Sequence, residues 1–290
     1  MSKDALPHRG NLVAAVAWMG LALLGFSLFA IAGREAGREL PTLQIMLWRG
    51  PISLVMLLVI ALVTGARPKT ERISVHAARS LLHFAAQFSW LTALALIPLA
   101  ELFALEFTAP LWVAVLAPLV LKERLTASRM AAAALGFAGV LVVIQPGSGT
   151  ISAGTVLGLL SALGFATAML ATKTLMRTDS AFTILVYMMV IQSVLSTILG
   201  LPGFVMPTAT TLLWLVAIAV AGLVSHFSLA QAFSRADAIL VAPMDFLRLP
   251  LIAAVGAFFY GEALDPIIML GAVIIVTANL VNIRGERRKT

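Results

Sequence analysis

The sequence predicts an all-α integral membrane protein: ten transmembrane helices, arranged as two inverted five-helix repeats, with both termini cytoplasmic. Three observations support this fold class: an apolar composition, ten long apolar segments, and an internal repeat. Hydrophobic residues make up 61% of the 290 residues and charged residues 11%, against roughly 45–50% and about 25% in soluble domains. The mean hydropathy of +1.02 agrees with a chain that is folded within lipid.

The helices follow one another with short breaks. A helix that crosses the hydrocarbon core needs about 20 apolar residues, and stretches of this size are separated by residues that end helices, such as Pro41 and Pro98. The first run is longer than the apolar part of a signal peptide, so we expect it to be retained as a helix. The predicted helices cover residues 11–33, 42–64, 75–97, 99–121, 127–145, 153–177, 180–200, 209–235, 238–260 and 265–283.

The basic residues are spread unevenly over the loops. With a cytoplasmic N-terminus, sixteen of the 20 Lys and Arg residues fall in inside segments, and only Arg34 and Arg38 fall in outside loops. Because cytoplasmic loops carry an excess of Lys and Arg, this pattern predicts an even number of helices. The net charge of +7 therefore reports orientation, and we expect no nucleic-acid partner.

A shift of 139 residues superposes the second half of the chain on the first without a gap. The residues brought together include Glu123 with Glu262, Gln87 with His226, and Glu106-Phe107 with Asp245-Phe246. We predict two units, residues 11–145 and 153–283. Since each unit has five helices, an odd number, the second enters the membrane from the opposite side. Inverted repeats of this kind recur in secondary transporters, whose substrates bind near the midplane between the halves.

Four strings carry a resemblance to a known family: LWRG around Arg49, LVLKERLT after the fourth helix, FFYGEALD after the ninth, and VAPMDFLRLP within it. On these, the chain resembles the EamA-domain branch of the drug/metabolite transporter superfamily over nearly its whole length. Among characterised types it is most similar to bacterial exporters of aromatic amino acids. The resemblance implies a bacterial inner-membrane carrier with a central cavity, which exports neutral or aromatic amino acids by alternating access.

The ninth helix carries charges near its middle. Asp245 and Arg248 lie between Pro243 and Pro250 in an otherwise apolar segment. A charge at this depth costs about 2.5–3.5 kcal/mol, so such residues face a protein interior or a wet cavity. Residues three apart share a helical face and can pair directly. Two interpretations stay open: an ion pair that neutralises itself, or a cavity wall that binds a substrate's ammonium and carboxylate groups.

Two charged residues of the first half lie at comparable depths. Arg49 is near the middle of the second helix and Glu106 is in the fourth. We predict that they pair across helices, or that Arg49 binds a substrate carboxylate. Tyr187 lies close to the repeat position of Arg49 and is a weaker candidate for the site.

A polar stripe runs along the third helix, where His83, Gln87 and Trp90 recur at i, i+4 and i+7. We expect this stripe to line the cavity together with His226, the repeat partner of Gln87. Protonation of either histidine could couple transport to protons, because histidine titrates near pH 6.5 when unperturbed. Phe107 and Met244 are candidates for the apolar wall of the pocket, with ordinary packing as the alternative.

Other classes of function receive less support. The chain has no cysteine and no phosphate-binding glycine loop or HExxH motif, so we expect no cofactor, no metal and no catalytic residues. The alternatives are a carrier for another metabolite, such as a nucleoside-derived cation that Glu106 and Asp245 would attract, a membrane-embedded enzyme built from His83 and Glu106, or a scaffold. The predicted partners are a small-molecule substrate and membrane lipid, and a monomer suffices for this fold.

Overall fold

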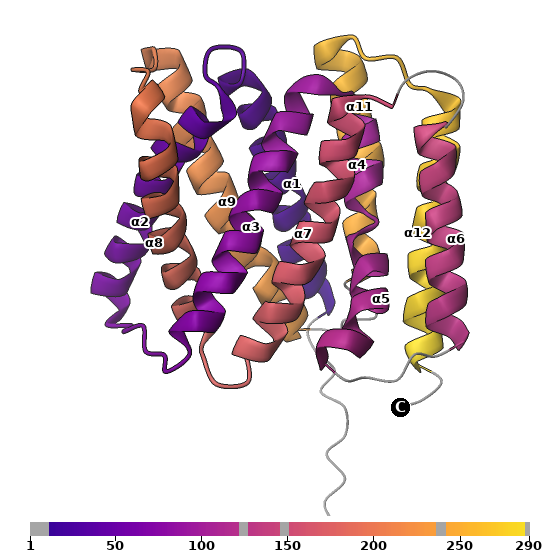
Figure 1. The fold of residues 1–290 in the computed structure, drawn as a ribbon, viewed down its shortest axis with the longest axis horizontal. Coiled ribbons are helices and arrows are strands. Elements are labelled where there is room, and N and C mark those ends of the chain that lie inside the picture. Colours follow the sequence, from indigo (N-terminus) through magenta and orange to yellow (C-terminus); the bar gives the residue numbers. More distant parts are fainter. Residues whose placement is uncertain (1–11, 122–126, 146–150, 236–241, 288–290) are drawn as a thin grey trace, which may run out of the picture.

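The computed structural model describes residues 12–121, 127–145, 151–235 and 242–287. These residues form a bundle of helices that stand side by side, without a β-strand among them (Figure 1). In chain order the elements are α1 (Leu12–Ala36), α2 (Thr42–Thr64), α3 (Ile73–Leu96), α4 (Leu99–Glu106), α5 (Ala109–Leu121), α6 (Ala127–Ile144), α7 (Ala153–Leu175), α8 (Ala181–Gly200), η1 (Leu201–Gly203), α9 (Ala209–Arg235), η2 (Ala242–Leu247), α11 (Arg248–Tyr260) and α12 (Pro266–Arg287).

Two of the predicted helices are broken, which corrects the expectation of continuous helices at 99–121 and 238–260. The first stops at Glu106 and restarts at Ala109 as α5. The second begins, within the described residues, as a 3-10 segment that ends at Leu247, and it continues from Arg248 as α11. Since Ala109 and Arg248 are 139 positions apart, the two breaks fall at the same place in the sequence repeat.

Side chains satisfy the backbone groups at the first break. Pro110 has no backbone N–H, so the carbonyl one turn before it loses its helical partner. The Thr108 hydroxyl donates to the Leu105 carbonyl at 2.6 Å, and the Asn279 amide donates to the Phe107 carbonyl at 2.8 Å. Backbone groups freed inside a membrane must find partners within the protein. The break between α4 and α5 is therefore held in part by α12.

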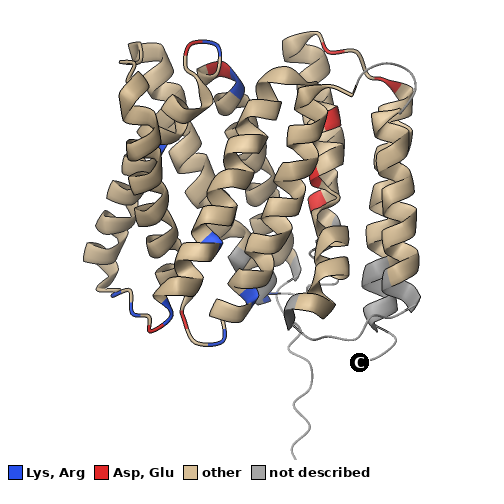
Figure 2. Ribbon diagram, viewed as in Figure 1, with Lys and Arg blue, Asp and Glu red and all other residues tan. Residues whose placement is uncertain are grey.

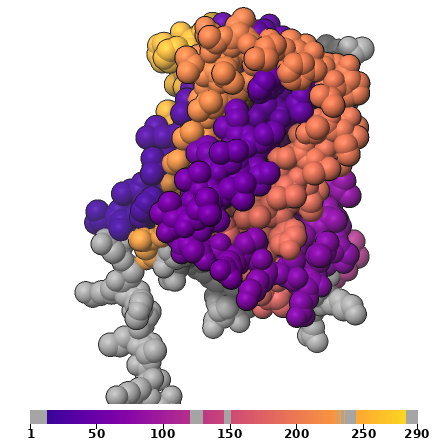
Figure 3. Space-filling view, turned by 90° about the vertical axis from the view of Figure 1, so that its left-hand side faces the viewer, coloured from indigo at the N-terminus to yellow at the C-terminus, as the bar shows by residue number. Residues whose placement is uncertain are grey.

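The helices pack in pairs that relate the two halves of the chain. α1 packs on α9, α3 on α7, α2 on α8, and α6 on α12. The sequence repeat matches α1 with α7 and α3 with α9. Exchanging the two halves therefore turns the α1–α9 pair into the α7–α3 pair, and it maps the α2–α8 and α6–α12 pairs onto themselves. Figure 3 shows the face where α2 lies among segments of the second half. A two-fold relation between the halves would produce this pattern, although the inverted repeat stays a prediction.

Within the described residues, six segments are long and apolar enough to cross a membrane, and two further apolar helices are shorter. The helices of the bundle expose large hydrophobic side chains, such as Val63 of α2 at 80% and Phe258 of α11 at 87%, as expected for contact with lipid. α3 is not among the six, and its polar residues His76, Arg79 and His83 lower its hydropathy. The expected count of ten spans therefore stays a prediction.

Charged side chains gather at the two ends of the bundle. Figure 2 shows Lys and Arg in the α2–α3 loop and the α7–α8 turn, which lie at one end, here named the basic end. The α1–α2 turn and the α11–α12 segment lie at the opposite end, where acidic side chains are more numerous. α1 begins and α12 finishes at the basic end (Figure 1). Lys3, Arg9, Lys122 and Arg124, which contribute to the predicted orientation, lie outside the described residues.

Small residues allow the helices to approach closely. A Cβ atom at Gly158 would lie 2.9 Å from the Leu105 side chain, and one at Gly164 would lie 2.8 Å from Ala86. α4 is thereby enclosed, and its residues Leu102–Leu105 are almost completely buried. Close packing around small residues is typical of helices in membranes, and it places the α4–α5 break inside the bundle.

Candidate functional site

Arg248 lies between two carboxylates at the helix breaks. Its Nη2 atom is 3.0 Å from Oε1 of Glu106 and 3.1 Å from Oδ2 of Asp245. Glu106 is the last residue of α4, Asp245 belongs to η2, and Arg248 is the first residue of α11. Glu106 and Asp245 are also partners in the sequence repeat. The two breaks thus bring one carboxylate from each half onto a single guanidinium, and we name these three residues the Arg248 group.

Aromatic rings surround this guanidinium. Its central carbon lies 4.8 Å from the ring centroid of Phe26, 5.1 Å from that of Phe103 and 5.3 Å from that of Phe107. A cation within about 6 Å of an aromatic face is attracted by the ring quadrupole. Trp90 adds a polar contact, because its Nε1 donates to Oε2 of Glu106 at 2.8 Å. Charge and aromatic surface therefore meet at one place.

The Arg248 group does not balance its own charge. It has two carboxylates and one guanidinium, and one oxygen of Asp245 and the Nε of Arg248 are buried without hydrogen-bond partners. The Asp245 side chain is 32% exposed, whereas that of Arg248 is 7% exposed. Buried polar atoms normally find partners. The group thus retains hydrogen-bonding capacity and negative charge that a ligand could use.

The predicted pair of Asp245 and Arg248 is confirmed, whereas the predicted pair of Arg49 and Glu106 is wrong. Both oxygens of Glu106 are occupied, one by Arg248 and one by Trp90. Arg49 is buried on α2, with its guanidinium 5.6 Å from the ring of Phe29. The reason is lateral position: α2 packs on α8 and α9, while α11 packs on α4.

The polar stripe of α3 is directed into the bundle, and its role in lining a cavity stays a prediction. Gln87 and Trp90 are buried, and Oε1 of Gln87 has no hydrogen-bond partner. The Gln192 amide lies 2.8 Å from Nδ1 of His83, which connects α8 to α3. His226 on α9 is exposed, and its ring lies edge-on to that of Phe26 at 5.5 Å. Because Phe26 also faces the Arg248 guanidinium, His226 lies next to the aromatic surround of the Arg248 group.

The remaining candidate residues of the predicted site lie in different parts of the bundle. Phe107 lies in the aromatic surround, with its ring 5.3 Å from Phe246. Met244 packs beside a small cluster of buried residues that includes Met19 on α1. Tyr187 stacks on His76 at 4.7 Å, and so belongs to the basic end rather than to the Arg248 group. In the sequence repeat Tyr187 lies close to the position that corresponds to Arg49, but this did not predict which residues Tyr187 contacts.

Arg79 is a buried cation that was counted among the basic residues of the inside segments, although it lies within the predicted helix 75–97. α3 begins at Ile73, so Arg79 lies almost two turns inside the helix, where it is 8% exposed. Its Nε donates to the Thr172 hydroxyl at 2.9 Å, and its Nη1 is buried without a partner. The spacing could have revealed it, because Arg79 precedes His83 by four residues and extends the polar stripe.

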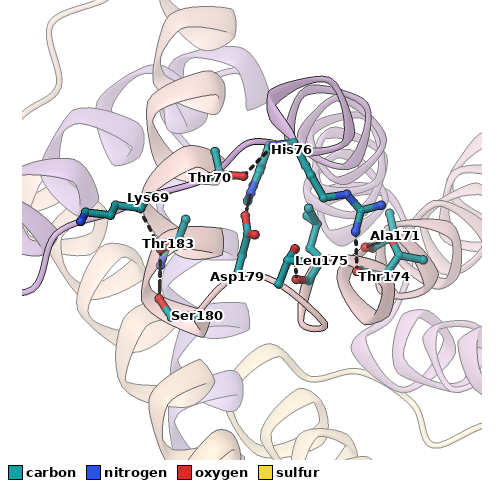
Figure 4. Close-up of polar contacts among 11 residues, drawn as sticks. Lys69, Thr70, His76, Ala171, Thr174, Leu175, Asp179, Ser180 and Thr183 are labelled. Carbon is teal, nitrogen blue, oxygen red and sulfur yellow. Dashed lines mark hydrogen bonds and ion pairs between the residues drawn. The ribbon is translucent and has the colours of Figure 1, made fainter.

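At the basic end, a cluster joins the two halves (Figure 4). Nε2 of His76 lies 2.7 Å from Oδ2 of Asp179, and both side chains are almost fully buried. Hydrogen bonds from Thr70, His76 and Thr178 lower the pKa of Asp179 to about 2. Lys69 contributes its backbone N–H, which donates to the Thr183 hydroxyl at 3.4 Å.

At the opposite end, two acidic residues hold the helix ends together. Glu39 accepts from the backbone N–H and the hydroxyl of Thr208 at 2.8 and 2.7 Å, and these bonds and one from Thr211 lower its pKa. Glu262 pairs with Arg34 and accepts from the first N–H of α4, at Leu99, at 2.8 Å. A carboxylate at a helix N-terminus is stabilising, so Glu262 stabilises the start of α4 and, like Asp179 at the basic end, joins the two halves of the chain.

Among the hollows that the described residues form, two are lined by residues outside the Arg248 group. One, of about 450 Å³, is an apolar groove on the α2 surface lined by residues such as Trp48 and Phe204. The other, of about 180 Å³, lies at the end opposite the basic end, next to Arg34, Arg38 and Tyr260. Neither surrounds the Arg248 group, so the predicted central cavity does not correspond to either hollow. No cluster of three metal-ligating side chains occurs in the described part of the chain.

An apolar helical bundle with charges at two interior helix breaks defines a multi-pass membrane protein of the transporter class. The chain belongs to the EamA-like transporter family, whose model matches residues 13–145 and again residues 152–284. This confirms the resemblance to the EamA branch of the drug/metabolite transporter superfamily.

Several curated bacterial transporters are similar to this chain over nearly their whole length. The chain is 32% identical over 281 residues to a riboflavin transporter of Rhizobium johnstonii, which covers 96% of this chain and 93% of that protein. It is 27% identical over 274 residues to an S-adenosylmethionine uptake transporter of Rickettsia prowazekii, covering 94% and 93%. It is 28% identical over 270 residues to a pseudopaline exporter of Pseudomonas aeruginosa, covering 92% and 95%.

A crystal structure shares the fold, with a TM-score of 0.66 at 19% identity over 95% of this chain and 98% of its own. This likeness concerns the fold alone. The family and these relatives are transporters rather than enzymes.

Proposed function

We propose that this chain is a secondary carrier that moves a small heteroaromatic metabolite through the site around Arg248. The observation that carries the proposal is the Arg248 group within its aromatic surround. Aromatic rings offer faces on which a planar ligand can stack, and Glu106, Asp245 and Arg248 offer polar atoms that can fix its orientation. Ligand sites combine an apolar wall with a few convergent polar groups in this way.

The choice of a heteroaromatic metabolite replaces the expectation of amino-acid export. Riboflavin and S-adenosylmethionine, named for two of the relatives, both join a planar heterocycle to a polar chain. The negative balance of the Arg248 group also suits a substrate with a positive or hydrogen-bond-donating portion, as the nucleoside-derived alternative requires. The relatives reported above give no support to neutral or aromatic amino acids.

The proposed mechanism is alternating access between two inverted five-helix repeats in a bacterial inner membrane, with the basic end cytoplasmic. Three features support it: the symmetric pairing of helices, the helix breaks at matching repeat positions, and the side-chain contacts that join the two halves at both ends. Discontinuous helices at the interface between repeats are where secondary transporters bind substrates. Opening one end requires the contacts of Glu262 or of Asp179 to separate.

The test is transport by the purified protein in proteoliposomes. Riboflavin, S-adenosylmethionine and phenylalanine would be supplied in parallel, each as a radiolabelled compound, to liposomes with and without protein. We expect protein-dependent, saturable uptake of at least one heteroaromatic compound, and its loss in the Arg248→Gln variant. Transport of phenylalanine alone, an aromatic amino acid without a heterocycle, would refute the heteroaromatic assignment. Full transport by the variant would remove the Arg248 group from the site.

A further inference from the structure

Two arginines of the interior lack an acidic partner in the part of the chain that the structure describes. Arg49 on α2 is 6% exposed and Arg79 on α3 is 8% exposed. Within the residues that the structure describes, neither forms an ion pair with a carboxylate, whereas Arg34, Arg38 and Arg248 each do. A buried charge is normally paired or coordinated. Two buried guanidinium groups that have no carboxylate partner among the described residues are therefore suited to a negative group of a ligand.

Polar side chains lie near these arginines. The positive charges of Arg49 and Arg79 both act on the imidazoles of His83 and His226. Gln192 adds an amide that hydrogen-bonds to His83. These side chains come from α2, α3, α8 and α9; α2 contacts the other three helices, and α3 also contacts α8. This region is thus a second polar cluster, with positive charge, beside the negatively balanced Arg248 group.

Unused hydrogen-bonding atoms lie within this cluster. Nη1 of Arg79 is buried without a partner, and the Thr172 hydroxyl occupies only its Nε. Arg49 has a cation–π contact with Phe29 and no hydrogen bond to the described residues. A guanidinium presents five donors in a planar fork that matches the oxygens of carboxylate and phosphate groups. The unused donors are therefore suited to an oxyanion.

We propose that Arg49 and Arg79 form a basic subsite, together with His83 and His226, that binds a carboxylate or phosphate group of the transported metabolite. The inference rests on the proposed function, since the same substrate would place its ring system at the Arg248 group. It specifies the substrate further: a heteroaromatic compound with an oxyanion at one end. The two clusters would then bind opposite ends of one molecule.

The experiment uses pairs of compounds that differ in the oxyanion. One pair is riboflavin and riboflavin 5′-phosphate; the other is S-adenosylmethionine and its decarboxylated form. Inhibition of radiolabelled uptake by each compound would be measured in proteoliposomes. In the unmodified protein we expect the oxyanion-bearing member of at least one pair to inhibit at about tenfold lower concentration, because charge-assisted bonds to arginine are strong. The responding pair identifies phosphate or carboxylate as the preferred group.

Variants then locate the preference. Arg49→Gln and Arg79→Gln should each reduce it to less than about twofold while the neutral or cationic member still inhibits. Arg38→Gln is the matched control, because Arg38 is 65% exposed and pairs with Glu35 near the hollow at the end opposite the basic end; it should leave the preference unchanged. The unmodified protein alone can refute the subsite, so recovery of folded variants is not required.

The outcomes distinguish the two proposals. Equal inhibition by both members of each pair, with heteroaromatic uptake intact, would overturn the subsite and leave the proposed function standing. A preference that survives both substitutions would overturn the assignment to these arginines. Failure of all four compounds to enter or compete would instead refute the proposed function.

Discussion

Replacing Arg248 by Gln should destabilise the protein more than replacing either of its carboxylate partners. The substitution leaves Glu106 and Asp245 close together without their shared counter-ion. The Glu106 side chain is 17% exposed and that of Asp245 32%, so solvent compensates only part of the loss. Breaking a buried ion pair by removing one partner costs about 3–5 kcal/mol, and the exposure of Asp245 favours the lower limit, about 3 kcal/mol.

The assay is thermal unfolding in detergent, followed by the fluorescence of the five tryptophans. In a chain of this size, about 1 kcal/mol shifts the melting temperature by roughly 2–4 °C, so Arg248→Gln should melt roughly 6–12 °C lower. Glu106→Gln is the matched comparison, because it leaves Arg248 paired with Asp245 and the group without net charge. We expect its shift to be less than half as large. An Arg248→Gln variant at least as stable as Glu106→Gln would refute the argument that the guanidinium is the counter-ion of both carboxylates.

Three further predictions concern the ends and the packing of the bundle. Folding lowers the pKa of Asp179 from 3.8 to about 2, so its contribution to stability is complete above about pH 4 and is lost as the pH falls toward 2. Over this pH range the melting temperature should fall less steeply for Asp179→Asn than for the unmodified protein. Identical slopes for the two proteins would contradict this prediction. A Cβ atom at Gly139 would lie 2.8 Å from α12, so Gly139→Val should cost about 1–3 kcal/mol in thermal unfolding, whereas Gly20→Val, at a position with open space, should not. The chain has no cysteine, so the double variant Arg34→Cys and Glu262→Cys introduces a unique pair of thiols. Joining the two thiols with a short bifunctional reagent should stop the uptake that the same variant shows before the reaction. Continued uptake after the reaction would contradict the view that this end must open during transport.

The sequence predicted most helix positions because lipid imposes a simple requirement. A spanning segment needs sufficient apolar length, and α2, α7 and α8 begin and end within a few residues of the predicted bounds. The breaks were not predicted, since proline alone is compatible with a kinked continuous helix. The first break depends on Asn279, more than 160 positions later, whose side-chain amide donates a hydrogen bond to the Phe107 carbonyl. Hydropathy contains no information on such a long-range hydrogen bond.

The site was predicted only in part from the sequence, because the sequence does not show which helices lie next to each other. Spacing along a helix identified Asp245 with Arg248, because residues three apart are neighbours by construction. Arg49 and Glu106 were expected to pair because they lie at comparable depths in the membrane. Depth gives only the position along the membrane normal, and it does not say which helices are adjacent. Arg79 was missed for a different reason: it lies within the predicted helix 75–97, but it was counted with the basic residues of the inside segments, so its burial in α3 was not considered.

The position of Arg248 connects ligand binding to the relation between the two halves. Glu106 belongs to the first half and Asp245 to the second, so one guanidinium links both halves. A substrate group that binds either carboxylate must compete with Arg248 for it, and this competition weakens a contact between the halves. A ligand can shift a conformational equilibrium only through its different affinity for the two states. An arginine shared by both halves supplies that difference at the site itself, which is why the Arg248 group, rather than the contacts at either end, is the place where occupancy and rearrangement would be coupled.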